Sequence, residues 1–145
     1  MRLTPSRQAH RLGTIGPGGV PEVSVVRVLV VDDQAAFLRA MTSVVEETHG
    51  FEVIGQASSG EESLGVAAER LPDLVLMDVN MPGIDGLETT RRLRAGDCPP
   101  VVVLLSTYDE DAGVHFVAEC GAAAYVTKSE FGPDRLEDVW SSLIP

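Results

Sequence analysis

The chain has 145 residues, enough for one domain, and its 22 acidic against 11 basic residues give a formal net charge of −11. This charge argues against direct binding of nucleic acid, which needs a positive surface, and favours cations or basic partners. Two cysteines are too few for a disulfide framework and predict reduced thiols in the cytoplasm. No apolar run suits a membrane span or a signal peptide, so neither is expected.

The first 24 residues differ in composition from the rest of the chain. They contain three arginines and several glycines and prolines, with too little apolar area to offset the entropy lost on ordering. We therefore predict a flexible tail over residues 1–24, with a docking arm as the alternative interpretation. A single domain is predicted over residues 25–145.

From Val25 onward, short apolar segments alternate with amphipathic ones. Runs rich in β-branched residues predict five buried strands, at residues 25–31, 51–57, 74–77, 101–105 and 121–127. Apolar residues at three- and four-residue spacing predict five helices, at residues 34–49, 61–70, 87–95, 109–120 and 133–143. The fourth helix should be the loosest, because Gly113 interrupts it. Strict alternation predicts an α/β domain with a parallel sheet and helices on both faces.

Polar residues stand at the carboxyl ends of the predicted strands. Asp32 and Asp33 follow the first strand, Asp78 the third, Ser106 the fourth and Lys128 the fifth. Because parallel strands end at one edge of a sheet, where ligands commonly bind, we expect these side chains to meet. Each residue alone has an ordinary explanation, such as a helix cap or a solvated strand end, but the set of five favours a functional site.

Three neighbouring carboxylates predict a bound cation, because their mutual repulsion is on the order of several kcal/mol. A hard divalent ion relieves this repulsion, and Mg²⁺ suits a site with few carboxylates and several retained waters. Lys128 would neutralise part of the remaining charge. Asp78, next to the turn Met81-Pro82-Gly83, could act as a nucleophile toward phosphorus, and Ser106 could donate a hydrogen bond to a phosphoryl oxygen.

These motifs resemble the receiver domains of two-component response regulators. The likeness covers roughly residues 25–143 and rests on the acidic pair, Asp78 with Met81-Pro82-Gly83 and Asp85-Gly86, Ser106, and Lys128 after an aromatic residue. Residues 78–86 and 106–109 look closest to the receivers of LuxR-type, NarL-like regulators. The resemblance implies a flavodoxin-like, three-layer (βα)5 fold with strand order 2-1-3-4-5.

The resemblance also implies a role for each site residue. Asp78 would accept a phosphoryl group from a histidine kinase or phosphotransfer protein, and Lys128 would contact that group. Asp33 would bind Mg²⁺ directly and Asp32 chiefly through water. Asp78 and the backbone carbonyl of Asn80 would complete the protein ligands.

Ser106 and Tyr125 look like a switch pair, in which the hydroxyl moves to the phosphoryl group and the aromatic ring turns inward. The change would alter the surface of the fourth helix, fifth strand and fifth helix, and so control an output domain, a partner or a homodimer. No recognition helix follows Leu143, so DNA binding by this chain itself is not expected.

On this interpretation the chain catalyses only its own phosphorylation and dephosphorylation. An alternative is a Mg²⁺-dependent phosphatase with Asp78 as nucleophile. Such an enzyme would have an acid two residues after Asp78, where this chain has Asn80, and this difference argues against it. A receiver-like scaffold that accepts no phosphate is another, and the intact acids and Lys128 oppose it.

Overall fold

The computed structural model describes residues 24–143, so the tail predicted over residues 1–24 lies outside the described residues except for Ser24. Five strands are present: β1 Val26–Val31, β2 Phe51–Ala57, β3 Leu74–Asp78, β4 Val101–Ser106 and β5 Ala124–Thr127. They form one parallel sheet in the order β2-β1-β3-β4-β5. The predicted flavodoxin-like order is therefore confirmed, with β1 and β3 side by side near its centre.

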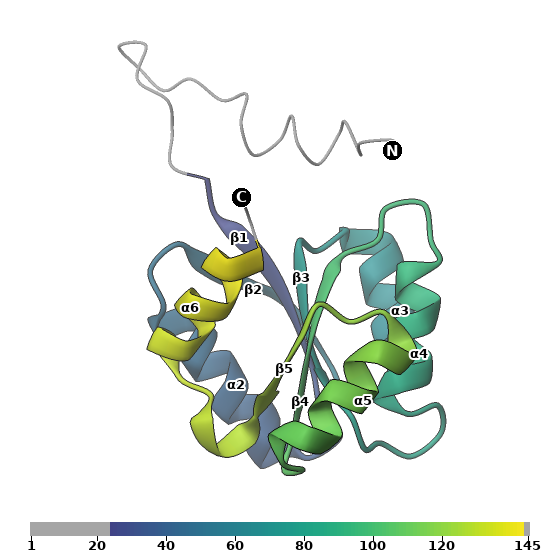
Figure 1. Cartoon of the computed structure of the whole chain (residues 1–145). Helices are drawn as coiled ribbons and strands as arrows, with labels where there is room; N and C mark the ends of the chain where they lie inside the picture. Colours follow the sequence, from purple (N-terminus) through teal and green to yellow (C-terminus); the bar gives the residue numbers. More distant parts are fainter. Residues whose placement is uncertain (1–23, 144–145) are drawn as a thin grey trace.

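Helices cover both faces of this sheet, as predicted. They are α2 Ala35–Glu47, α3 Gly60–Arg70, α4 Gly86–Arg94, α5 Glu110–Cys120 and α6 Pro133–Leu143. In Figure 1, α2 and α6 lie on one face, and α3, α4 and α5 lie on the other. Within residues 24–143, no helix is both long enough and apolar enough to cross a membrane.

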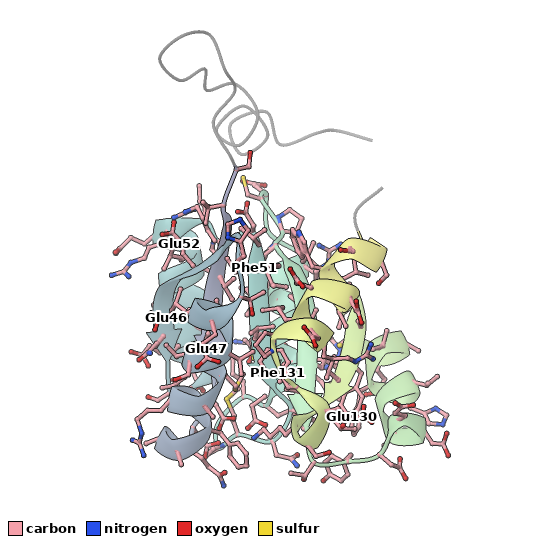
Figure 2. The ribbon with its side chains drawn as sticks, turned by 90° about the vertical axis from the view of Figure 1, so that its left-hand side faces the viewer. Glu46, Glu47, Phe51, Glu52, Glu130 and Phe131 are labelled. Atoms are coloured by element: carbon pink, nitrogen blue, oxygen red, sulfur yellow. The ribbon has the colours of Figure 1, made fainter. Side chains whose placement is uncertain are left out.

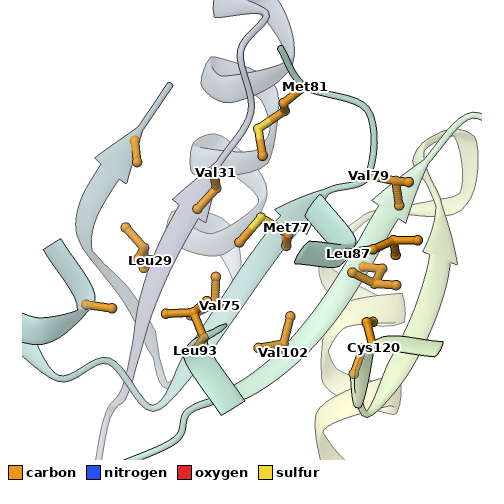
Figure 3. Close-up of a cluster of buried hydrophobic side chains, with 14 residues drawn as sticks. Leu29, Val31, Val75, Met77, Val79, Met81, Leu87, Leu93, Val102 and Cys120 are labelled. Carbon is orange, nitrogen blue, oxygen red and sulfur yellow. The ribbon is translucent and has the colours of Figure 1, made fainter. Parts of the chain in front are cut away.

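The alternating directions of strand side chains divide the apolar core into two halves. Leu29 and Val31 belong to the half under α3, α4 and α5, which Figure 3 shows, whereas Val28 and Val30 belong to the half under α2 and α6. Successive side chains of a strand point to opposite faces, and here both faces are covered. This is why β3 and β4 are apolar almost throughout rather than at every second position.

The layer formed by α2 and α6 is acidic on its solvent side. Figure 2 views the molecule from this side, where Glu46 and Glu47 extend from α2 and Glu130 follows β5; all three are exposed. The ring of Phe51, at the start of β2, packs edge to face on Trp140, with 6.2 Å between ring centroids. This aromatic pair lies at the amino end of the sheet, opposite the strand ends that carry the predicted site.

One local prediction is wrong, and one short element was missed. The fifth strand begins at Ala124 rather than Gly121, because Gly121 has a φ of 84° and ends α5 as its left-handed cap. A short 3-10 turn over Lys128–Glu130, η2, was not predicted.

Gly113 has a packing reason to stand inside α5, since a Cβ there would overlap the ring of Tyr125. The expected looseness of α5 remains a prediction.

Gly86 should be essential to the packing of α4 behind β3. A Cβ at this position would overlap the carbonyl oxygen of Asp78, so Gly86→Ala should lower the free energy of unfolding by about 3 kcal/mol. Gly65, inside α3, has nothing within 4 Å of its Cβ position. Gly65→Ala should therefore raise the free energy of unfolding by about 0.5–1 kcal/mol. Urea unfolding measures both changes in free energy. Equal changes for the two variants would contradict the close packing of Gly86 against the Asp78 carbonyl oxygen.

Candidate functional site

Four of the predicted site residues meet at the carboxyl edge of the sheet, the lower edge in Figure 1. Asp32 and Asp33 follow β1, Asp78 ends β3, and Lys128 follows β5. One carboxylate oxygen from each of the three acids lies within 4.8 Å of the others. The Nζ of Lys128 lies 2.8 Å from Asp32 Oδ2 and 3.1 Å from Asp78 Oδ1. The sheet thus gathers three negative charges and one positive charge in one small volume.

The three acids differ in how freely they can bind an ion. Asp32 is fully buried, and besides contacting Lys128 it accepts a 2.9 Å hydrogen bond from the backbone N–H of Gln34 at the start of α2. Asp78 is nearly buried, whereas Asp33 is exposed. These oxygen donors fit a hard divalent cation, with Asp33 the acid most open to it.

The loop between β3 and α4 is held from two sides. Gly83 has a φ of 79°, in keeping with the turn chemistry of this segment. Glu61, in the first turn of α3, accepts a 3.2 Å hydrogen bond from the backbone N–H of Ile84. On the opposite side, the Nδ2 of Asn80 donates a 3.1 Å hydrogen bond to the hydroxyl of Tyr108. These contacts fix the segment that carries the Asn80 carbonyl, a predicted ion ligand.

Tyr108 connects the two residues predicted as a switch pair. Ser106, buried at the end of β4, accepts a long 3.5 Å hydrogen bond from the backbone N–H of Tyr108. Tyr125, half-buried on β5, donates its hydroxyl hydrogen bond to the Tyr108 carbonyl. The rings of Tyr108 and Tyr125 both pack edge to face on Phe116 of α5. Sequence reasoning placed Ser106 and Tyr125 but missed this connection, because strand periodicity does not register contacts made by a loop.

Phe37 is the second site neighbour that the sequence analysis missed. Phe37 is one of the apolar residues whose spacing predicts the helix at residues 34–49, which favours an inward-facing position. The structure places its ring centroid 3.9 Å from the Nζ of Lys128. The available signal was its distance from the acidic pair. Phe37 stands four residues after Asp33, about one helical turn, so the two could have been expected near one end of α2.

The electrostatics of the site disfavour the ionised form of Asp78. Burial and the negative charge of Asp32 raise the pKa of Asp78 to about 6, although the hydrogen bond with Lys128 opposes this rise. Burial alone would lower the pKa of Lys128, but its hydrogen bonds with Asp32 and Asp78 raise that pKa above its ordinary value. Lys128 therefore stays charged at neutral pH without fully compensating the acids, and a further cation would be favoured.

Comparisons with known proteins agree with this geometry. Residues 28–140 match the family described as the response regulator receiver domain. The response regulator GacA of Pseudomonas viridiflava is 46% identical over 104 residues, 72% of this chain and 49% of that protein. The transcriptional regulatory protein LiaR of Bacillus subtilis is 35% identical over 105 residues, 72% of this chain and 50% of that protein. The chain therefore spans about half the length of these curated relatives.

A solved structure covers almost the same region. The signal receiver domain of the response regulator NarL from Mycobacterium tuberculosis superposes with a TM-score of 0.74 at 30% identity. The match covers 82% of this chain and 96% of that one. The similarity therefore covers most of this chain and nearly all of that receiver domain.

Asp78→Asn should stabilise the protein at neutral pH when no metal is present. Between its ordinary pKa of 3.8 and about 6, Asp78 binds more protons in the folded protein than in the unfolded chain, so stability falls as pH rises through this window. The variant has no carboxyl group at position 78 to lose a proton, so its stability does not fall in this way. Its contact with Lys128 is weaker, and this offsets part of the gain. Its free energy of unfolding should therefore exceed that of the wild type by about 1–2 kcal/mol at pH 7. Near pH 4 the two should match.

Thermal unfolding in a chelating buffer measures this difference. Asp97→Asn, at an exposed acid in the loop after α4, is the control for the loss of one carboxylate outside the site. A stabilisation by Asp78→Asn that is the same at both pH values would contradict the crowding of charge at the site.

Proposed function

Because this chain belongs to the family of response regulator receiver domains, we propose that residues 25–145 form a receiver that accepts a phosphoryl group on Asp78. The observation that carries the proposal is the position of the Asp78 carboxylate, beside Asp32, Asp33 and Lys128. The donor would be a histidine kinase or a phosphotransfer protein. Cys98 and Cys120 form no disulfide in the described part of the chain, which supports a cytoplasmic setting for the exchange.

The chemistry we propose needs little covalent work from the protein. An ionised oxygen of Asp78 forms a bond to phosphorus while the bond between phosphorus and the donor's leaving group breaks, and the leaving group keeps the electron pair. Lys128 stays protonated and offsets charge on the phosphoryl oxygens, and Ser106 donates a hydrogen bond to one of them. The chain would thus catalyse only its own phosphorylation and the later hydrolysis of the acyl phosphate, in which water takes the phosphoryl group and the Asp78 carboxylate is restored.

We infer Mg²⁺ as the ion for this site. Asp33 is exposed and would bind it directly, whereas Asp32, already held by Lys128 and by a backbone N–H, would act chiefly through water. Asp78 and the backbone carbonyl of Asn80 would complete the protein ligands. When bound, the ion supplies positive charge that offsets the three carboxylates and the incoming phosphoryl oxygens.

We further propose that phosphorylation is signalled through Tyr108. A phosphoryl group would attract the hydroxyl of Ser106, which now accepts from the Tyr108 N–H, while the Tyr125 hydroxyl rests on the Tyr108 carbonyl. The resulting shift would change the surface formed by α5, β5 and α6. An output domain, a partner or a second copy of the chain would respond to that surface. The lengths of GacA and LiaR support a regulatory role in which other segments carry the output.

Phosphoryl transfer to Asp78 can be tested with a small donor. Wild-type protein incubated with acetyl phosphate and Mg²⁺ should gain one phosphoryl group by intact-mass spectrometry, and Asp78→Asn should gain none, whereas Asp97→Asn should label normally. An unlabelled wild type, or undiminished labelling of Asp78→Asn, would contradict the proposal.

Two further measurements address the alternatives. Steady turnover of phosphomonoesters would indicate a phosphatase. Failure to bind Mg²⁺ at roughly millimolar concentration would indicate a scaffold.

Asp33 and Lys128 should contribute differently to ion binding and to phosphoryl transfer. Asp33→Asn should weaken Mg²⁺ binding by at least about tenfold, because it removes the most accessible negative ligand. Lys128→Gln should leave Mg²⁺ affinity unchanged or tighten it up to about tenfold, since it removes a positive charge close to the acids, yet it should slow labelling strongly. Calorimetric titration and labelling rates measure the two effects. Weaker Mg²⁺ binding in Lys128→Gln would be incompatible with these roles.

A further inference from the structure

The ammonium group of Lys128 has an uncharged neighbour as well as two charged ones. Its Nζ contacts Asp32 and Asp78 at 2.8 and 3.1 Å and lies 3.9 Å from the centroid of the Phe37 ring. Only 9% of the lysine side chain is exposed. A cation this close to the face of an aromatic ring is attracted to it, most strongly where water is excluded. We propose that Phe37 is a positioning residue that holds the Lys128 ammonium for phosphoryl transfer, an inference that rests on the proposed acceptance by Asp78.

The two carboxylates alone cannot hold the ammonium in one place throughout the reaction. Asp78 becomes an acyl phosphate, and its former negative charge moves onto the phosphoryl oxygens. Asp32 would share its charge with the bound cation. The attraction to the Phe37 ring does not depend on either change, because the ring carries no net charge to be neutralised. The ring is therefore the constant partner of Lys128 before, during and after transfer.

The fold makes Phe37 suitable for this task. Phe37 lies in the first turn of α2, and the start of that helix is fixed by the hydrogen bond from the Gln34 N–H to Asp32. Lys128 comes from the opposite end of the chain, where β5 passes into η2. The ring thus connects α2 to the end of β5 across the site. A lysine side chain has several rotatable bonds, and restraining it in advance removes an ordering step from the transition state.

This role differs from packing in what it predicts. Phe37 is not an ion ligand, so weakening its ring should slow phosphoryl transfer while leaving Mg²⁺ affinity unchanged. The rate of phosphoryl transfer should also depend on the negative potential at the face of the ring rather than on the size of the ring. A side chain that only fills space would slow the reaction in proportion to lost volume, and would change stability as well.

A series of ring-fluorinated phenylalanines at position 37 separates the two roles. Successive fluorine atoms withdraw negative potential from the ring face with little change in volume. The rate of labelling by acetyl phosphate at saturating Mg²⁺ should fall stepwise along the series, by about fivefold at the highest substitution, and Phe37→Leu should be at least as slow. The dissociation constant for Mg²⁺ should stay constant along the fluorinated series.

The same fluorinated series at Phe51 is the matched control. Phe51 is the first residue of β2, at the amino end of the sheet, and its ring packs on Trp140 (Figure 2 labels Phe51). Labelling should not change along the Phe51 series. A second readout needs no reaction. In metal-free protein, the NMR signals of the Lys128 Cε protons should be shifted upfield by the Phe37 ring, and this shift should disappear in Phe37→Leu.

The outcomes distinguish this inference from the proposed function. Normal labelling of the wild type, with a flat rate along the Phe37 series or no ring-current shift at Lys128, would overturn the positioning role and leave Asp78 as the acceptor. A wild type that does not label would overturn both.

Discussion

Crowding of negative charge around one carboxylate is the constraint on which the functional edge of this protein depends. Asp32, Asp33 and Asp78 each bring an oxygen within 4.8 Å of the others, and the single ammonium of Lys128 lies between two of them. Burial and Asp32 raise the pKa of Asp78 to about 6 despite that ammonium. An arrangement with an unrelieved excess of negative charge favours binding of a divalent cation, and with it a strongly anionic phosphoryl group.

The fold supports this crowding with an apolar core on each face of the sheet. Buried strands with both faces covered deliver Asp78 and Lys128 to one edge, and Gly86 lets α4 start directly behind Asp78. The same edge is connected to the surface of α5, β5 and α6 by contacts of Tyr108 with Asn80 and Tyr125. A change of charge at the acids therefore has a short physical route to a surface that another molecule can contact.

Strand ends predicted the parallel α/β fold and the meeting of Asp32, Asp33, Asp78 and Lys128, whereas the strand order came from the resemblance to receiver domains. Apolar runs that stop at Asp32 and Asp78 mark where parallel strands terminate, and parallel order then places those acids at one edge. The start of β5 was wrong because apolar composition continues through Ala122, while the backbone of Gly121 still belongs to the helix end. Phe37 escaped notice because an inward-facing helical position has the same spacing whether its ring meets the core or a charged group.

The central claim is that phosphorus becomes bonded to Asp78, and reductive trapping tests it at the level of the atom. Borohydride converts an acyl phosphate of aspartate into homoserine and leaves free carboxylates unchanged. After treatment with acetyl phosphate and Mg²⁺, followed by borohydride, peptide mass spectrometry should find homoserine at position 78. Homoserine at Asp32, at Asp33 or at no position in the chain would contradict the account.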